Sequence, residues 1–434
     1  MGANARERRA DRRPGRRVAD MAEFLKVKTA EEVLELVRTF SPLDAERCGL
    51  PECLGRTLAA PIAAPEPLPH FPRASMDGFA VRARDTFGAS ETLPALLDVS
   101  GEAAMGREPS GRVEAGKAHA IATGAMLPPG ADAVVMVEYT ALLEKYVIEV
   151  SKPVAPGENV LSEGEDIGLG ELILPAGRRL APHDLGILAA LGVTGPEVGR
   201  RPRVAIISTG DEIVPVETPS LPPGKIRDIN THTLRALVLE ASGVVGGISV
   251  APDDPEAIAA ECRALLSDHD VILISGGSSV GARDFTVRIL EGFADSEILV
   301  HGVAVRPGKP TILARIGGKM VWGLPGQPVA ALMVFSAFVR PSLLHLQGRA
   351  VPAEPPEGLR QATLALRLPS VHGRTDYVPV ALTRGGEGLR ATPLFGKSAT
   401  IGILARADGY LIIPTHVEGL DEGSEVSVHS FHSG

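Results

Sequence analysis

The sequence is poor in cysteine, in aromatic residues and in long hydrophobic runs, and each shortage excludes a class of protein. Only 3 of its 434 residues are cysteine, an odd number that suits neither a zinc site nor a disulfide framework, so we expect buried thiols in a reducing cytoplasm. Aromatic residues make up 4%, which disfavours a protein that stacks single-stranded nucleic acid on aromatic rings. The longest apolar stretch, around Val329–Val339, is shorter than the roughly 18 residues that span a membrane. We therefore expect a cytoplasmic protein that binds neither nucleic acid nor a membrane.

Charge is distributed unevenly along the chain. The formal net charge is −9, yet residues 1–17 hold seven arginines and only two acidic residues. Such a basic run could contact nucleic acid or lipid. It has no apolar face, however, and Met21 resembles a natural start. We predict that residues 1–20 are a disordered basic extension.

The length and the local patterns divide the remaining chain into domains, because 434 residues exceed one ordinary hydrophobic core. Residues 61–164 consist of short apolar runs broken by glycine and proline, which is typical of β structure. Residues 165–195 turn helical again, so this β-rich domain is predicted to be inserted into a split first domain, 21–60 plus 165–195. After a proline-rich linker, residues 349–434 return to short β runs and predict a small C-terminal β domain.

Residues 196–348 alternate apolar strands with helices, which predicts a doubly wound parallel sheet. The fold class is therefore α/β and β multidomain, with this α/β domain at the centre. The main expected elements are strands at Val204–Ser208, Ile248–Val250 and Val271–Ser275, and helices at Thr231–Ala241, Pro255–Leu266 and Phe285–Leu290.

Polar, glycine-rich loops follow the strands of this domain, at the edge where open parallel sheets bind ligands. We expect these loops to converge on one cleft. The loop at residues 276–281 offers backbone N–H groups just before a helix, which suits an anion such as phosphate, although it matches neither the P-loop nor the dinucleotide pattern. The loop residues are Ser208, Thr209, Gly210, Asp211 and Glu212 after the first strand, Gly276, Gly277 and Ser279 after the third, and Pro325 and Gln327 after a later one.

Cations and carboxylates accompany these loops. Arg306 and Lys309 flank a Pro-Gly turn, which is rigid enough to aim Lys309 at an oxyanion. Carboxylates gathered beside a phosphate site commonly hold Mg²⁺. Each acidic residue alone could be a helix cap or a solvated charge, but together they favour a metal and phosphate site. The acidic residues at strand and loop ends are Asp211, Glu212, Asp228 and Asp284.

The order of short motifs along the chain carries a family resemblance. The motifs are Ala74–Ala80, Ala122–Ala125, Gly157–Ile167, Ser208–Glu212, Ile226–Asn230, Ser275–Gly281, Arg306–Pro310 and Gly323–Val329. In this order they resemble the molybdopterin molybdenumtransferase family, the bacterial MoeA type to which the E domain of gephyrin is related. The resemblance runs from about Glu23 into the C-terminal β domain. Each motif alone is weak, but so many in one order are specific.

The resemblance implies an activity and its partners. The enzyme would take adenylylated molybdopterin, cleave its pyrophosphate with release of AMP, and insert molybdenum from molybdate into the dithiolene, with Mg²⁺ assisting. It would be a homodimer in which the β-rich domain of one subunit brings Asp77 and Thr123 to the α/β cleft of the other. Molybdopterin adenylyltransferase and recipient molybdoenzymes are the further partners expected.

The resemblance also implies roles for individual residues. Catalysis would fall to Asp77, Asp284, Lys309 and Glu212. The metal would be held by Asp211, Glu212, Asp228 and Asp284. Substrate would be bound by Thr123, Ser208, Thr209, Gly210, Gly276, Gly277, Ser279, Arg306, Pro325 and Gln327.

Three positions depart from the family pattern and leave alternatives open. Leu161 stands where arginine is usual, Ala282 where an acidic residue is usual, and Arg306 where lysine is usual. A guanidinium is not equivalent to an ammonium, so a tungstate-preferring paralogue is one alternative. A second is molybdopterin adenylyltransferase, which shares the α/β fold and an ending similar to Arg283–Thr286. A third is a non-catalytic scaffold that binds molybdopterin.

Overall fold

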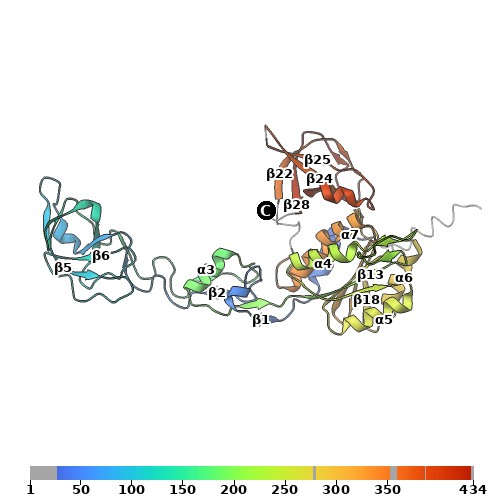
Figure 1. Cartoon of the computed structure of the whole chain (residues 1–434), viewed down its shortest axis with the longest axis horizontal. Coiled ribbons are helices and arrows are strands. Elements are labelled where there is room, and N and C mark those ends of the chain that lie inside the picture. Colours follow the sequence, from blue (N-terminus) through green and yellow to red (C-terminus); the bar gives the residue numbers. More distant parts are fainter. Residues whose placement is uncertain (1–26, 277–279, 352–358, 387, 432–434) are drawn as a thin grey trace, which may run out of the picture. The chain divides into compact units, whose positions relative to one another are not determined.

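The computed structural model describes residues 27–276, 280–351, 359–386 and 388–431. The predicted extension at residues 1–20 lies outside this part of the chain. The chain forms two compact units, each described here by itself (Figure 1). The first unit contains residues 1–46, 55–59 and 197–434, and the second contains residues 47–54 and 60–196. The finer domain boundaries given above stay predictions.

A six-stranded sheet forms the centre of the first unit. Its strands are β13 (Arg203–Thr209), β16 (Val244–Ala251), β17 (Val271–Ser275), β18 (Ser296–His301), β20 (Ile312–Ile316) and β21 (Lys319–Leu324). Their order is β16-β13-β17-β21-β20-β18, and the first four strands are parallel. The prediction of a parallel sheet is wrong for β20, which pairs antiparallel with both β21 and β18. Gly317 and Gly318, with φ of 54° and 81°, close a tight hairpin between β20 and β21, whereas a parallel pair needs a long crossover.

Helices cover both faces of this sheet, which confirms the doubly wound prediction (Figure 1). Val204 and Ile206 of β13 pack in a core with α4 and α7, while Ala205 and Ile207 pack in a second core with α5 and α6. This alternation follows from the period of two along a strand. The helices are α4 (Asn230–Glu240), α5 (Pro255–Leu266), α6 (Val280–Glu291), α7 (Pro328–Val334), a π-helical turn η4 (Phe335–Val339) and α8 (Arg340–Leu346).

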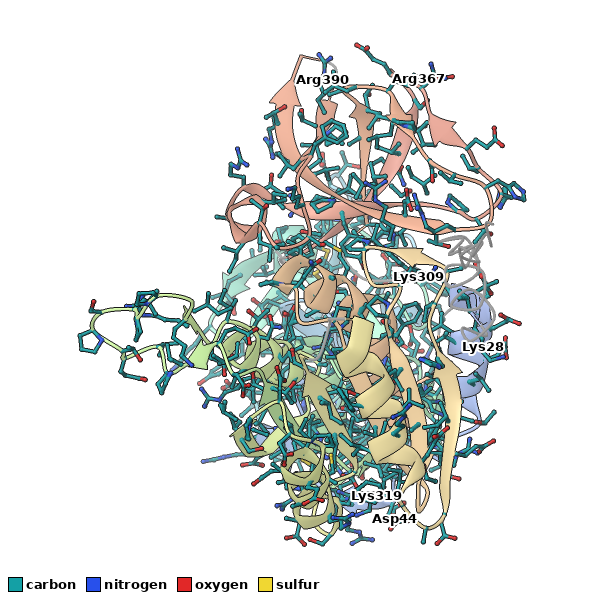
Figure 2. All side chains as sticks on the ribbon, turned by 90° about the vertical axis from the view of Figure 1, so that its right-hand side faces the viewer. Lys28, Asp44, Lys309, Lys319, Arg367 and Arg390 are labelled. Carbon is teal, nitrogen blue, oxygen red and sulfur yellow. The ribbon has the colours of Figure 1, made fainter. Side chains whose placement is uncertain are left out.

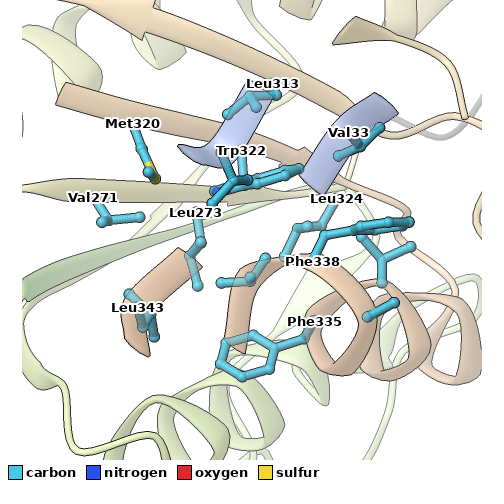
Figure 3. Close-up of a cluster of buried hydrophobic side chains, with 14 of the residues drawn as sticks. Val33, Val271, Leu273, Leu313, Met320, Trp322, Leu324, Phe335, Phe338 and Leu343 are labelled. Atoms are coloured by element: carbon cyan, nitrogen blue, oxygen red, sulfur yellow. The ribbon is translucent and has the colours of Figure 1, made fainter. Parts of the chain in front are cut away.

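The first core is centred on the single tryptophan. Trp322 is fully buried and stacks on Phe338, with ring centroids 6.4 Å apart and planes 15° apart (Figure 3). Helix α2 (Ala30–Arg38) adds Val33 to this core. Thr29 caps α2 in a capping box with Glu32, which satisfies free N–H groups at the start of the helix.

The helical run Pro328–Leu346 corrects one estimate made from the sequence. It has 19 residues and a mean hydropathy of 1.7, so by length and composition it could cross a membrane. The apolar stretch alone was shorter because it did not include α8. In the structure, 72% of the most apolar part of this run is buried, and Met333 and Phe335 pack against the sheet. The run is a core helix of the first unit.

The C-terminal part of the first unit is a second six-stranded sheet. Its strands are β19 (Val305–Arg306), β22 (Leu359–Leu364), β24 (Thr375–Gly385), β25 (Gly388–Pro393), β26 (Gly409–Ile413) and β28 (Glu425–Ser430), with β23 (Leu368–Pro369), β27 (Gly419–Leu420) and the 3-10 helix η5 (Ile401–Arg406) beside them. Strand β19 comes from the α/β segment and pairs in parallel with β24, with Val305 opposite Thr375 and Arg306 opposite Asp376. This pairing fixes the Arg306 loop against the C-terminal sheet.

The second unit is mainly β structure, as predicted for residues 61–164. Six strands form one sheet in the order β7-β4-β6-β5-β9-β8. They are β4 (Gly78–Val81), β5 (Ala95–Ala103), β6 (Lys117–Ile121), β7 (Ala133–Met136), β8 (Thr140–Glu144) and β9 (Val147–Val150), accompanied by short strands β2 (Ile62–Ala63), β3 (Arg73–Ala74), β10 (Val160–Leu161) and β11 (Leu172–Leu174). Helix α3 (Pro182–Ala190) follows, where the sequence turned helical again.

Candidate functional site

The carboxyl ends of β13, β17 and β21 lie side by side at one edge of the α/β sheet. Ser208 is in register with Ser275, and Ser275 with Leu324, so the three polar loops leave the sheet at the same place. Asn230 ties two of them together, because its Nδ2 donates to Ser275 Oγ (2.8 Å) and to the Gly326 carbonyl (2.9 Å). The loops therefore leave the sheet at one edge, as predicted, but of their predicted residues that the structure describes, only Pro325 and Gln327 line the cavity described below.

Gly276 is required for a reason that the sequence did not reveal. Its φ is +138°, and a Cβ built there would lie 2.2 Å from the Thr209 carbonyl oxygen and 2.3 Å from Thr209 Oγ1. We expected a glycine that lets the main chain approach a ligand, but the close approach is to the end of the neighbouring strand. Gly277 and Ser279 lie outside the described residues.

Asp228 is engaged within the protein. It is buried, and its Oδ1 accepts hydrogen bonds from Ser208 Oγ (3.4 Å) and from the Thr231 amide at the start of α4 (3.1 Å). A carboxylate at this position stabilises the start of the helix, because it accepts a hydrogen bond from a free backbone N–H group and its negative charge faces the positive end of the helix dipole. Asp228 thus acts as a helix cap, the alternative left open above for each acidic residue. Because Oδ1 already accepts two hydrogen bonds, it is less available to bind a metal.

Three exposed carboxylates gather near the end of β13, and one of them was missed in the sequence. The Asp253 amide donates to Asp211 Oδ1 (3.2 Å). Partial desolvation raises the pKa of Asp253, and the negative charges of Glu212 and Asp211 raise it further. Asp253 follows β16, the fourth parallel strand, so applying the strand-end rule to that strand would have found it.

The described carboxylates do not by themselves form a metal cage. Within the residues that the structure describes, no group of three or more His, Cys, Asp or Glu side chains is placed to hold a metal ion. The side chain of Asp284, in α6, lies outside that part of the structure. Asp211, Glu212 and Asp253 nevertheless concentrate negative charge that a divalent cation would relieve.

A cavity of about 800 Å³ lies within the first unit, between the α/β loops and the C-terminal sheet. Its walls include Pro325 and Gln327, which the sequence predicted to bind substrate. Figure 2 labels Lys309 on the loop after β19, beside the C-terminal strands. The cationic side chains that line the cavity are Arg306, Lys309, Arg374 and Lys397.

Three of these cations form no ion pair in the described parts of the chain. They are Arg306, Lys309 and Lys397, all exposed, whereas Arg374 pairs with Asp376. Unpaired cations facing a concave, partly apolar wall attract anions. This arrangement is compatible with the oxyanion role predicted for Lys309.

Arg374 was missed in the sequence and is fixed by a buried carboxylate. Its Nε donates to Asp376 Oδ1 (2.6 Å) and its Nη2 to Asp376 Oδ2 (3.1 Å), while Ser370 Oγ donates to Oδ2 (3.1 Å). Asp376 is only 4% exposed, so the guanidinium is held in one orientation at the cavity wall. Only the pairing of β19 with β24 brings Arg374 beside Arg306, and no local motif signals it.

Asp77 and Thr123 meet in the second unit, although they are far apart in the sequence. Asp77 Oδ1 accepts hydrogen bonds from the Thr123 amide (2.7 Å) and from Thr123 Oγ1 (2.8 Å). The Thr123 amide, and then its hydroxyl, lower the pKa of Asp77 by stabilising the carboxylate. Within the described residues, both of these hydrogen bonds go to Oδ1. Their part in catalysis stays a prediction.

Comparison with known proteins matches nearly the whole chain to one family. The family descriptions that match are "MoeA N-terminal region (domain I and II)" at residues 25–192, "Probable molybdopterin binding domain" at 205–345, and "MoeA C-terminal region (domain IV)" at 361–431. Molybdopterin molybdenumtransferase 2 of Mycobacterium tuberculosis is 35% identical over 91% of this chain and 96% of its own length. Molybdopterin molybdenumtransferase of Bacillus subtilis is 34% identical over 89% of both chains.

Solved structures agree with these relatives. Two crystal structures of the molybdopterin biosynthesis protein MoeA from Pyrococcus horikoshii have TM-scores of 0.78 and 0.80 with this chain. They are 40% and 32% identical to it, cover 94% and 93% of it, and are themselves covered completely, at 100%. The resemblance found in the sequence motifs is confirmed. The chain belongs to the MoeA family of molybdopterin molybdenumtransferases, transferases of molybdenum cofactor biosynthesis.

Proposed function

We propose that this protein takes adenylylated molybdopterin and molybdate, cleaves the pyrophosphate with release of AMP, and leaves molybdenum bound to the dithiolene. The observation that carries this proposal is the cavity of about 800 Å³ lined by Arg306, Lys309, Arg374 and Lys397. Its size is within the range of small-molecule sites. Four cations suit a ligand that combines a pyrophosphate with an oxyanion.

The cationic side chains would act by neutralising charge. Cleavage of a phosphoanhydride places negative charge on the departing AMP phosphate, and fixed cations stabilise that charge without reorganising. Arg374 is oriented in advance by Asp376, so little conformational entropy would be lost when it meets the ligand. The exposed Lys309 would follow the phosphate or the oxyanion as charge develops.

Mg²⁺ fits this proposal as a partner of the substrate and not as an ion held by protein alone. Mg²⁺ commonly binds one or two carboxylates together with phosphates and several waters. Asp211, Glu212 and Asp253 would supply the carboxylates, and the ion would neutralise the phosphate oxygens during cleavage. We propose that Asp284, which was predicted to bind the metal, supplies a further carboxylate at the same site.

The decisive experiment measures AMP release from adenylylated molybdopterin, with Mg²⁺ and either molybdate or tungstate, followed by reactivation of an apo-molybdoenzyme. Release that depends on the oxyanion supports the proposal and identifies the preferred metal. Lys309→Ala should slow release by about a hundredfold. Arg367→Ala is the matched control, because Arg367 is 81% exposed and pairs with Asp421 outside the cavity (Figure 2).

Other outcomes would identify the alternatives. Transfer of AMP from ATP to molybdopterin would indicate an adenylyltransferase, although the match to the flanking MoeA regions speaks against it. Tight binding of adenylylated molybdopterin without release would indicate a scaffold. We also propose that the protein is a homodimer. A cytoplasmic location is proposed as well, and the three buried free cysteines agree with its reducing environment. Mixing Asp77→Ala with Lys309→Ala subunits should restore part of the activity if each site uses both chains.

A further inference from the structure

An exposed aromatic ring stands at the cationic cavity. Phe395 is 64% exposed, in a chain with only 4% aromatic residues, and it lines the cavity together with Lys309 and Arg374. Burial of a phenyl ring is favourable. A ring that is left in solvent beside a binding cavity is therefore a candidate for contact with a ligand.

The backbone that carries Phe395 is fixed at both ends. On one side, the Leu394 amide donates to the Pro379 carbonyl (2.9 Å). On the other, the Ser398 carbonyl accepts from the Val329 amide (3.2 Å), and Ser398 Oγ donates to Gln327 Oε1. The short loop thus joins the C-terminal sheet to the start of α7. A ligand that meets this ring would not have to order the loop first.

The backbone beside the ring is closely packed. A Cβ on Gly396 would lie 2.3 Å from Ile403 Cδ1, so the chain next to Phe395 packs against η5. The apolar side of the cavity continues with Val378 and Pro379. The cavity therefore combines an apolar wall with an aromatic face and a set of cations.

We propose that Phe395 stacks on a fused nitrogen heteroaromatic ring of the substrate, while Lys309 and Arg306 contact its phosphates. This inference rests on the proposed function, since the substrate named there carries two such rings, the pterin and the adenine, on either side of a pyrophosphate. A planar π-face binds either ring, because stacking is tolerant of ring identity. Phe395 would be a positioning residue that holds the ring while the cations act on the phosphate.

The test compares ligands with and without a ring on a series of variants of the full chain. Binding of AMP, 6-methylpterin and inorganic pyrophosphate is measured by calorimetry for wild type, Phe395→Ala, Phe395→Leu and Phe395→Tyr. Loss of a stacked ring should weaken binding about tenfold. Phe395→Ala and Phe395→Leu should show this loss for AMP, for 6-methylpterin, or for both, and the affected probe identifies the ring. Phe395→Tyr should restore binding, and pyrophosphate binding should stay unchanged.

Phe87→Ala is the matched control, because Phe87 is 63% exposed and belongs to the second unit. It should bind every probe as wild type does. The inference is overturned if wild type binds neither ring, if Phe395→Leu binds both rings as tightly as wild type, or if pyrophosphate binding falls equally. The proposed function fails separately, through the absence of AMP release by wild type. AMP release that persists with unchanged KM in Phe395→Ala would overturn only the stacking role.

Discussion

Replacement of Gly276 by alanine should destabilise the first unit, because the protein itself fills the space that a side chain needs. The added Cβ would lie 2.2 Å from the Thr209 carbonyl oxygen, roughly 1 Å inside ordinary van der Waals contact. Overpacking costs about 1–3 kcal/mol, and a side chain held at a φ of +138° costs about 1–3 kcal/mol more. The expected loss is therefore about 2–6 kcal/mol, or roughly 5–20 °C in the thermal midpoint of a unit of this size.

The assay follows thermal unfolding of the full chain by near-UV circular dichroism, where the single buried Trp322 reports on the first unit. Gly317→Ala is the control, since Gly317 has a similarly left-handed φ of 54° but nothing within 4 Å of its Cβ position. It should cost only about 1–2 kcal/mol. Equal midpoints for the two variants would refute the argument that Thr209 excludes a side chain at position 276.

Three further predictions concern other parts of the chain. Thr123→Val removes the hydroxyl that helps to stabilise the Asp77 carboxylate, so the Asp77 pKa, followed by NMR, should rise toward its ordinary value; an unchanged pKa would contradict the arrangement. Trp322→Ala should cost about 3–5 kcal/mol through the cavity it leaves, and Trp322→Phe much less, as measured by denaturant unfolding. Burial lowers the pKa of His119, so the folded second unit binds fewer protons than the unfolded chain. Its stability should therefore fall as the pH drops below about 6.5, and His119→Leu should remove most of that dependence in thermal scans from pH 8 to pH 5.

The elements of the α/β domain were readable from the sequence because each depends on local pattern. Helix α5 begins at Asp254 and Pro255, where a carboxylate cap precedes a proline suited to the first turn. Strand β17 is a continuous apolar run, as expected for a strand buried on both faces. The antiparallel direction of β20 departs from the predicted parallel sheet. The hairpin at Gly317 and Gly318 sets this direction, and the pattern of apolar residues does not reveal it.

The sequence by itself determined the family, the alternation of strands and helices, and the loops that meet at the carboxyl edge of the sheet. These features follow from the spacing of apolar residues, from the residues that cap helices, and from the order of the motifs along the chain. The tertiary structure decided which charges work together. Arg374 reaches the cavity because β19, which comes from the α/β segment, pairs with β24 of the C-terminal sheet, and Asp228 is engaged by Ser208 and the start of α4. Such contacts join residues that are distant in the chain, so no local spacing records them, and only the folded chain brings them together.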